Sequence, residues 1–191
     1  TKQNLSFLGL GNVVLDGAFS IRGNGTSIDN VDIIDGNLNV EGSKTAVYVA
    51  ASDVSLQNLS ITNPGNVAGL FAILTVSGFG AGLSVDTVNV SGFDTGLYMN
   101  PGATGAEVVD STFEATRAGL GIDSVQGVVL DGNTFSGGDV DAELFNIDPA
   151  MFTATDNTFS TGVIELTGGV PLSFGPSTLI NVAYDSLQIG T

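Results

Sequence analysis

The stretch Leu130-Asp131-Gly132-Asn133-Thr134-Phe135 recurs along this chain of 191 residues. It returns 24 residues later as Ala154-Thr155-Asp156-Asn157-Thr158-Phe159, and it occurs 22 residues earlier as Val108-Val109-Asp110-Ser111-Thr112-Phe113. A short phrase that recurs at a period of about 23 residues is typical of a solenoid, in which each repeat forms one coil of a stack. The repeat therefore predicts the fold.

Eight copies of this six-residue phrase align along the sequence, with spacings of 23, 28, 29, 23, 22, 24 and 25 residues between their first positions. The first and last copies match the others least well. The copies are Leu5–Leu10, Ile28–Ile33, Leu56–Ile61, Val85–Val90, Val108–Phe113, Leu130–Phe135, Ala154–Phe159 and Leu179–Tyr184.

The six positions of the phrase differ in chemistry. Positions one and six are apolar in every copy, and position five is mostly polar. An inward position four, an outward position five and an inward position six give the period of two of a half-buried strand. Positions two and three carry Asp, Asn, Gly or Thr in most copies, which favours a tight bend.

A second strand signal follows most copies and gives each coil two or three short strands. No stretch combines ten residues of helical period with a cap, so essentially no helix is expected. An antiparallel sandwich would need two-residue turns flanked by strands, and the phrase does not supply them. The second strand signals are Ala46–Val49, Gly69–Ile73, Gly96–Met99, Gly119–Ile122 and Leu144–Ile147.

Two sequence motifs resemble the coil repeat of the pectate-lyase-like superfamily. They are Asp131-Gly132-Asn133-Thr134-Phe135 and Gly96-Leu97-Tyr98-Met99. The resemblance covers nearly the whole chain and implies an all-β, right-handed parallel β-helix. The eight copies of the phrase predict about eight coils in one domain, residues 1–191, which could belong to a longer solenoid or assembly. Enzymes of that superfamily include polysaccharide lyases, polygalacturonase-like hydrolases and uronate epimerases. The resemblance is specific to the fold and does not select among these activities.

The composition narrows the possible partners. Only Lys2, Arg22, Lys44 and Arg117 are basic, against 20 acidic residues, and the net charge is −16. Nucleic acids and anionic membranes need clusters of basic residues, so neither is an expected partner. No apolar run reaches the roughly 18 residues of a membrane span. The acidic surface fits hydration in a salty or extracellular medium, and it equally fits cation binding.

The candidate catalytic residues of an enzyme on this fold are the carboxylates of the bends. Asp86 and Asp131 occupy position two, whereas Asp110 and Asp156 occupy position three. They fall in consecutive coils, so neighbouring carboxylates are expected roughly 5–7 Å apart along one edge. Acid–base hydrolysis needs such a convergent pair, but the same residue types also suit the turns themselves. Arg117 is interpreted as a solvated turn residue.

A possible calcium site follows the sixth copy of the phrase. Asp139, Asp141 and Glu143 alternate along an extended segment, which would place three carboxylates on one face. Calcium prefers such oxygen ligands. A solvated acidic strand is the alternative.

Two interior features are expected where equivalent positions of successive coils stack in columns. Asn133 and Asn157 should form a short buried amide ladder with Ser111 at its edge. Phe113, Phe135 and Phe159 should stack one per coil, about 4.8 Å apart.

Three functions remain open. The first is a non-catalytic extracellular solenoid with a structural, filament-forming or adhesive role, because catalytic bases are scarce and both ends lack a polar cap. Such ends predict end-to-end self-association or coverage by neighbouring domains. The second is a polysaccharide-active enzyme that uses the bend carboxylates. The third is a calcium-dependent carbohydrate-binding module, for which the sequence identifies no sugar-binding residues.

Overall fold

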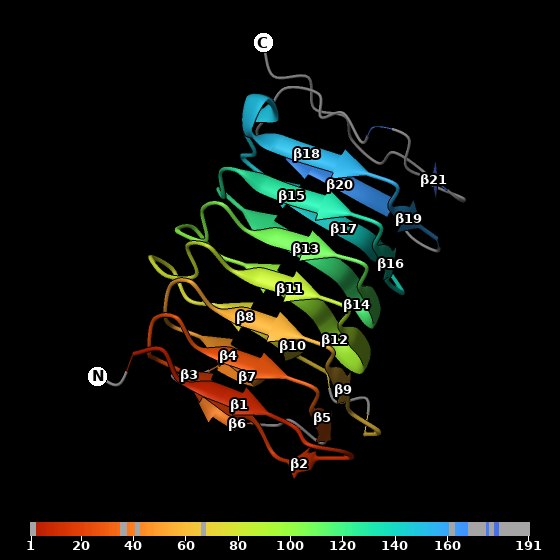
Figure 1. Cartoon of the computed structure of the whole chain (residues 1–191). Helices are drawn as coiled ribbons and strands as arrows, with labels where there is room; N and C mark the ends of the chain where they lie inside the picture. The colour runs from red at the N-terminus through yellow and green to blue at the C-terminus, as the bar shows by residue number, and fades with distance from the viewer. Residues whose placement is uncertain are drawn as a thin grey trace.

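In the computed structural model the chain is a stack of parallel β-coils (Figure 1). The structure describes residues 3–34, 38–40, 43–65, 68–160, 163–167, 175 and 178–179. Within these residues all strand pairings are parallel except one, in which β6 (Leu38–Val40) runs antiparallel to β7 (Ser43–Val49). The expected all-β parallel solenoid is confirmed.

The number of turns of the solenoid follows from the shorter of the two sheets. It has seven strands in chain order, so six complete turns lie between its first and last strand in the described part of the chain, fewer than the eight coils expected. Its strands are β1 (Ser6–Leu8), β4 (Ser27–Asp29), β8 (Ser55–Gln57), β11 (Ser84–Asp86), β13 (Glu107–Val109), β15 (Val128–Asp131) and β18 (Phe152–Thr155).

The longer sheet has 14 strands and forms the other walls of each coil. A three-residue 3-10 helix, Pro149–Met151, precedes β18. One path of the sheet runs through β2 (Val14–Asp16), β5 (Asp32–Ile34), β9 (Ser60–Thr62), β12 (Asn89–Met99), β14 (Thr112–Asp123), β16 (Thr134–Ser136), β19 (Thr158–Phe159) and β21 (Thr178–Leu179). The remaining strands are β3 (Phe19–Ile21), β6, β7, β10 (Leu70–Thr75), β17 (Val140–Phe145) and β20 (Val163–Thr167).

The register predicted for the first and last copies of the phrase is wrong. Phe7, not Leu5, lies opposite Ile28 in the column of position one. Leu179 pairs with Phe159, which belongs to the column of position six. Phe7 precedes Ile28 by 21 residues, whereas the alignment of the phrase requires 23. The four second strands from Ala46 to Ile122 are confirmed, but the fifth, expected at Leu144–Ile147, is β17 and begins at Val140.

Position three makes the bend between the two sheets. A residue with positive φ is rare outside glycine, although Asn and Asp tolerate this left-handed conformation better than most residues. The sequence prediction of a tight bend is therefore confirmed at this position. The six residues and their φ angles are Asn30 (57°), Asn58 (51°), Thr87 (55°), Asp110 (47°), Gly132 (69°) and Asp156 (53°).

Thr87 is the one β-branched residue among these bends, and its replacement should stabilise the protein. The left-handed conformation costs a residue with a Cβ about 1–2 kcal/mol, and branching at Cβ adds crowding. Thr87→Asn is expected to raise the free energy of unfolding by about 1 kcal/mol in urea titrations. Its hydroxyl donates a 2.8 Å hydrogen bond to Asp86, but this bond is exposed and its loss should cost little. Thr134→Asn, in an extended strand, should bring no gain, and a loss of stability in Thr87→Asn would contradict the argument.

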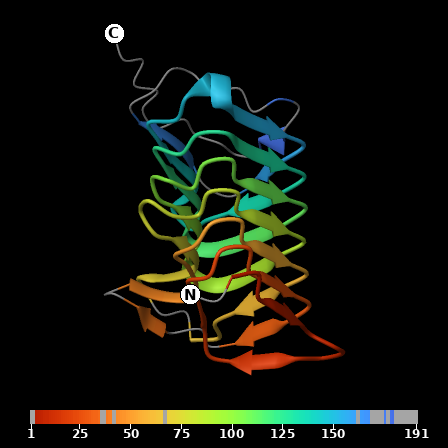
Figure 2. The same ribbon diagram turned by 60° about the vertical axis from the view of Figure 1, so that its left-hand side comes forward.

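Figure 2 shows the coils stacked one above another along the solenoid. Their buried apolar side chains form one continuous core between the sheets. The expected phenylalanine stack is confirmed: the ring centroids of Phe113 and Phe135 lie 5.5 Å apart, and those of Phe135 and Phe159 lie 5.4 Å apart. Each ring therefore packs on the equivalent ring of the next coil, which fixes the register of these coils.

The amide ladder is also confirmed. Asn133 accepts a 2.9 Å hydrogen bond from the backbone N–H of Ser111 and donates a 2.8 Å bond to the carbonyl of Val108. Its own N–H and its side-chain amide both donate to Oδ1 of Asn157, each at 3.0 Å. The three ladder residues are at most 1% exposed, so their hydrogen bonds replace water inside the core.

In the described part of the chain, no helix is both long and apolar enough to cross a membrane.

Candidate functional sites

The four bend carboxylates lie in two neighbouring columns. Asp86 and Asp131 end β11 and β15 as half-buried strand residues, whereas Asp110 and Asp156 occupy the left-handed bend. In the strand column Val109 lies between Asp86 and Asp131. The carboxylates therefore alternate between two columns from coil to coil and do not form one continuous row.

Two of these carboxylates contact the bend of the next coil. Asp131 accepts a 2.6 Å hydrogen bond from the hydroxyl of Thr155, one coil further along. Oδ1 of Asp110 lies only 2.4 Å from the place that a Cβ on Gly132 would occupy, so the carboxylate covers the next bend. Contacts of this kind stabilise the turns of the coils. The catalytic role of the four residues stays a prediction.

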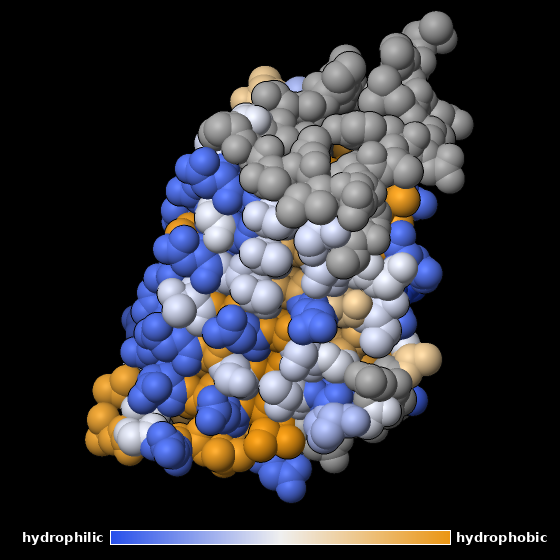
Figure 3. Space-filling view, turned by 90° about the vertical axis from the view of Figure 1, so that its right-hand side faces the viewer, coloured by the Kyte–Doolittle hydropathy of each residue, from blue (hydrophilic) through white to orange (hydrophobic). Residues whose placement is uncertain are grey.

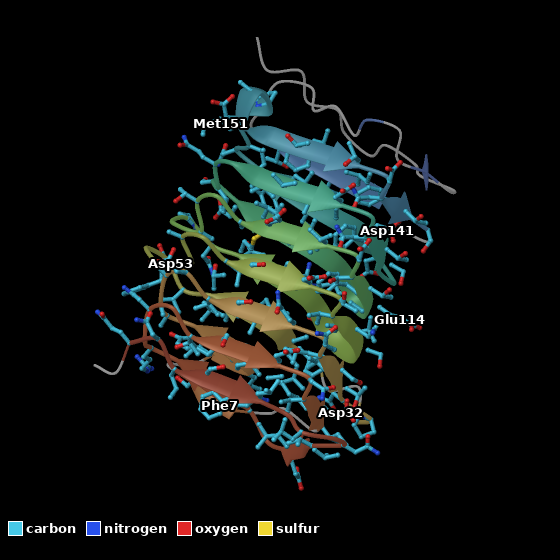
Figure 4. The ribbon with its side chains drawn as sticks, viewed as in Figure 1. Phe7, Asp32, Asp53, Glu114, Asp141 and Met151 are labelled. Atoms are coloured by element: carbon cyan, nitrogen blue, oxygen red, sulfur yellow. The ribbon has the colours of Figure 1, made fainter. Side chains whose placement is uncertain are left out.

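The acidic segment 139–143 does not present its three carboxylates together. Asp141 is fully buried within the stack, where its Oδ1 accepts a 3.0 Å hydrogen bond from the N–H of Gly137 (Figure 4). Asp139 is exposed, and Glu143 forms an ion pair with Arg117. Of the three carboxylates only Asp139 is exposed, because Asp141 is buried and Glu143 is paired, and a calcium site here stays a prediction. Among the residues described, no three His, Cys, Asp or Glu side chains are grouped to hold a metal ion.

Arg117 lies within β14 and connects three successive coils, so its interpretation as a turn residue is wrong. Its Nε lies 3.4 Å from Oδ2 of Asp94 on the preceding coil, and a second nitrogen contacts Oε1 of Glu143 on the following coil. A third nitrogen donates a 2.8 Å hydrogen bond to the hydroxyl of Thr95. Burial lowers the pKa of the guanidinium, but Glu143 and Asp94 raise it further, so the net shift is upward.

A second apolar cluster lies apart from the main core on the longer sheet. Tyr48 and Leu74 are its buried members, and Ala50, Phe71, Val76 and Tyr98 pack against them. Tyr48, Leu74 and Tyr98 occupy one column in successive coils. Phe71 and Tyr98 are only partly buried, and their rings meet edge to face with centroids 5.8 Å apart.

Tyr98 joins the aromatic cluster to the ionic one. Its ring lies over Gly121 of the next coil, where a Cβ would come within 2.3 Å of Cδ2 of the ring. Only glycine leaves room for the ring at that position. Burial raises the pKa of the Tyr98 phenol, as do Asp123 and Glu143, whereas Arg117 lowers it. The phenol is therefore protonated at neutral pH and available as a hydrogen-bond donor.

Phe71, Asp94, Tyr98, Arg117 and Glu143 are called the outer cluster below. Sequence reasoning missed this site, although one signal was present. Arg117 is the only basic residue between Lys44 and the end of the chain, and Tyr98 occurs in the second strand signal one coil before it. Pairing in register brings these two residues onto neighbouring strands, β12 and β14.

The first coil forms a separate candidate surface. Large apolar side chains are exposed there in a concentration found nowhere else among the described residues, and Figure 3 shows them as the orange area at the lower end of the stack. They are Leu5, Phe7, Leu8, Leu10, Val13 and Val14, with Ile34 of the next coil beside them.

No protein-family model, no curated protein and no solved structure matches this chain significantly. The structure itself establishes a parallel β-solenoid, and membership of the pectate-lyase-like superfamily remains a resemblance of the repeat.

Proposed function

We propose that the protein is a non-catalytic extracellular β-solenoid with an adhesive role, and that it binds uncharged polysaccharide through the outer cluster. The observation that carries this proposal is the pair of partly exposed aromatic rings, Phe71 and Tyr98, beside an ionic network of Asp94, Arg117 and Glu143. The acidic surface supports the extracellular location, since such surfaces stay hydrated in salty media.

The aromatic rings supply the apolar part of such a site. A sugar ring has an apolar face of C–H groups and a rim of hydroxyls, so it packs on an aromatic face with its hydroxyls directed sideways. Tyr98 has an apolar ring and a polar tip, which is the combination that amphipathic ligands favour. The outward fifth position of the phrase is polar from the second to the seventh copy, so the fold itself does not require aromatic residues on an outer face. These residues are Asp32, Ser60, Asn89, Thr112, Thr134 and Thr158.

The ionic network supplies the polar part. The side chains of Arg117, Asp94 and Glu143 remain 34%, 23% and 14% exposed, so each keeps hydrogen-bonding capacity toward solvent. Carboxylate oxygens accept bonds from hydroxyls, and the guanidinium and the phenol donate them. A few such groups beside an apolar platform are the usual composition of a small-molecule site.

The local charge favours an uncharged ligand over a uronate. Asp94, Glu143 and the nearby Asp123 outnumber the single Arg117, and the whole chain carries −16. An acidic sugar would meet this excess of like charge, whereas the positive group that would pair with it is already engaged by two carboxylates. Arg117 is thus poorly placed to neutralise a substrate carboxylate, which argues against lyase chemistry at this cluster.

Calorimetric titration of the intact chain tests the proposal. Cellohexaose, as a neutral probe, should bind at least tenfold more tightly than an oligogalacturonate of equal length. Tyr98→Ala should weaken binding of the neutral probe about tenfold, which corresponds to 1.4 kcal/mol, because it removes the exposed ring. Tyr98→Phe should keep most of the affinity.

The matched control is Thr134→Ala, on the outer side of β16, which should leave binding unchanged. Chelation with EDTA should also have no effect, and loss of binding on chelation would instead favour a calcium-dependent module. Equal binding of the uronate, no binding of the neutral probe, or full affinity in a folded Tyr98→Ala variant would each contradict the proposal.

A further inference from the structure

We infer that the polysaccharide site continues along the stack from Tyr98 to Phe145, so that it holds an internal stretch of a neutral glycan chain and not a single sugar unit. This inference rests on the proposed function, because it extends the outer cluster by one further aromatic ring. The three strands concerned, β12, β14 and β17, lie side by side in successive coils (Figure 1).

Phe145 lies on the same outer face of the longer sheet as the outer cluster. Tyr98, Gly121 and Glu143 form one column across β12, β14 and β17. Phe145 follows Glu143 by two residues, and side chains two residues apart in a strand point to the same face. The burial pattern agrees, because Leu144 between them belongs to the main core and is only 2% exposed.

The ring of Phe145 packs against neither apolar cluster of the described residues. It is partly exposed and belongs neither to the main core nor to the second cluster, whereas Phe71 and Tyr98 pack in the second cluster. Its neighbours in the column, Asp123 and Thr167, are polar. Phe145 is thus an aromatic ring among polar groups on an outer face, which is the composition expected of a site that contacts a ligand.

The separation of the two rings suits a chain of sugar units. Tyr98 and Phe145 are two coils and two residues apart, which corresponds to roughly 12 Å between their Cα atoms. The Tyr98 ring lies over Gly121, on the coil between them, and this shortens the gap between the rings. One sugar ring is too short to contact both aromatic rings, whereas a chain of several linked units spans them.

The polar groups between the two rings favour a glycan over an apolar ligand. Asp123 lies opposite Phe145 on β14 and raises the pKa of the Tyr98 phenol, so its charge acts close to both rings. Its Oδ1 accepts a 2.8 Å hydrogen bond from the hydroxyl of Ser124, and the carboxylate keeps further acceptor positions for sugar hydroxyls. An apolar ligand would instead cover Asp123 and Glu143 and leave these carboxylates without partners.

Calorimetric titration of the intact chain with cellobiose and with cellohexaose tests the inference. Cellohexaose should bind the unmodified chain at least about twentyfold more tightly, because only the longer sugar contacts both rings. Phe145→Ala should weaken binding of cellohexaose about fivefold and change that of cellobiose less than about twofold, since Tyr98 still holds the shorter sugar. Phe79→Ala, at an exposed ring outside the outer cluster, is the matched control and should change neither affinity.

Phe145→Trp gives a second readout, because the chain contains no tryptophan. Bound cellohexaose should shift the fluorescence emission of the introduced tryptophan to shorter wavelength, since the sugar displaces water from the ring. The Phe145 side chain is partly exposed and outside both apolar clusters, so both variants should fold normally.

The outcomes separate the extended site from the proposed function. If cellohexaose does not bind the unmodified chain, both are overturned. If cellohexaose binds and Tyr98→Ala weakens it, but Phe145→Ala has no effect and the introduced tryptophan does not respond, only the extended site is overturned. Equal affinity for cellobiose and cellohexaose would also overturn the extended site alone.

Discussion

Phe135→Ala is expected to lower the free energy of unfolding by about 3–5 kcal/mol, which is a large part of the stability of a domain of this size. Phe135 is fully buried and is the central ring of three, stacked on Phe113 on one side and on Phe159 on the other. Its removal would leave a cavity between two rings that are held on separate strands. Those strands cannot collapse into the cavity without disturbing the parallel ladder of β14, β16 and β19.

Urea denaturation followed by circular dichroism measures this effect. Phe79→Ala is the matched control, since Phe79 is 44% exposed and its truncation should cost less than about 1 kcal/mol. Phe135→Leu, which keeps most of the volume, should recover more than half of the loss. If Phe135→Ala and Phe79→Ala destabilised the protein equally, the ring stack would not be the main contact between these coils.

Asn133→Ala is the second substitution with a large expected effect. The backbone N–H of Ser111 and the carbonyl of Val108 would lose their side-chain partner in a region with no access to water. Each buried polar group that is left without a partner costs roughly 1–3 kcal/mol, so a loss of about 2–6 kcal/mol is expected. Asn157 would still accept the hydrogen bond from the backbone N–H of residue 133, but it would lose the hydrogen bond that the side-chain amide of Asn133 donates.

The chain offers two controls for this substitution. Asn89→Ala, at an exposed position of β12, should change the unfolding free energy by less than about 0.5 kcal/mol. Asn133→Ser copies the residue found at the same position one coil earlier, Ser111, and should restore part of the loss. If Asn133→Ala proved as mild as Asn89→Ala, the ladder would not carry the stabilising role assigned to it.

The candidate sites were predictable to different degrees. The bend carboxylates were assigned to coils correctly, because the phrase fixes their column positions. The surroundings of the acidic segment were not predictable, because they depend on contacts outside its own strand: the N–H of Gly137 for Asp141 and the guanidinium of Arg117 for Glu143. Asp141 is buried, and Glu143 pairs with Arg117.

The outer cluster could not have been assembled from the sequence, for a related reason. Asp94, Arg117 and Glu143 are separated by more than twenty residues each, and they meet only because β12, β14 and β17 pair in register. The pairing of β12 with β14 also shifts twice between Val90 and Thr95. A periodic alignment does not reveal such shifts.

The sequence by itself determined that the chain is a parallel β-solenoid, which columns fill its interior and where each coil bends. These features repeat in every coil. A recurring pattern of apolar, bend and polar positions is satisfied by stacking the coils, because stacking buries each apolar position against its equivalent in the next coil. The tertiary structure alone decided the register of the first and last copies, the burial of Asp141 and the bridging role of Arg117. Each of these depends on which residues of neighbouring coils lie opposite one another. Bulges and loops of unequal length change this register, and the repeat in the sequence does not reveal them.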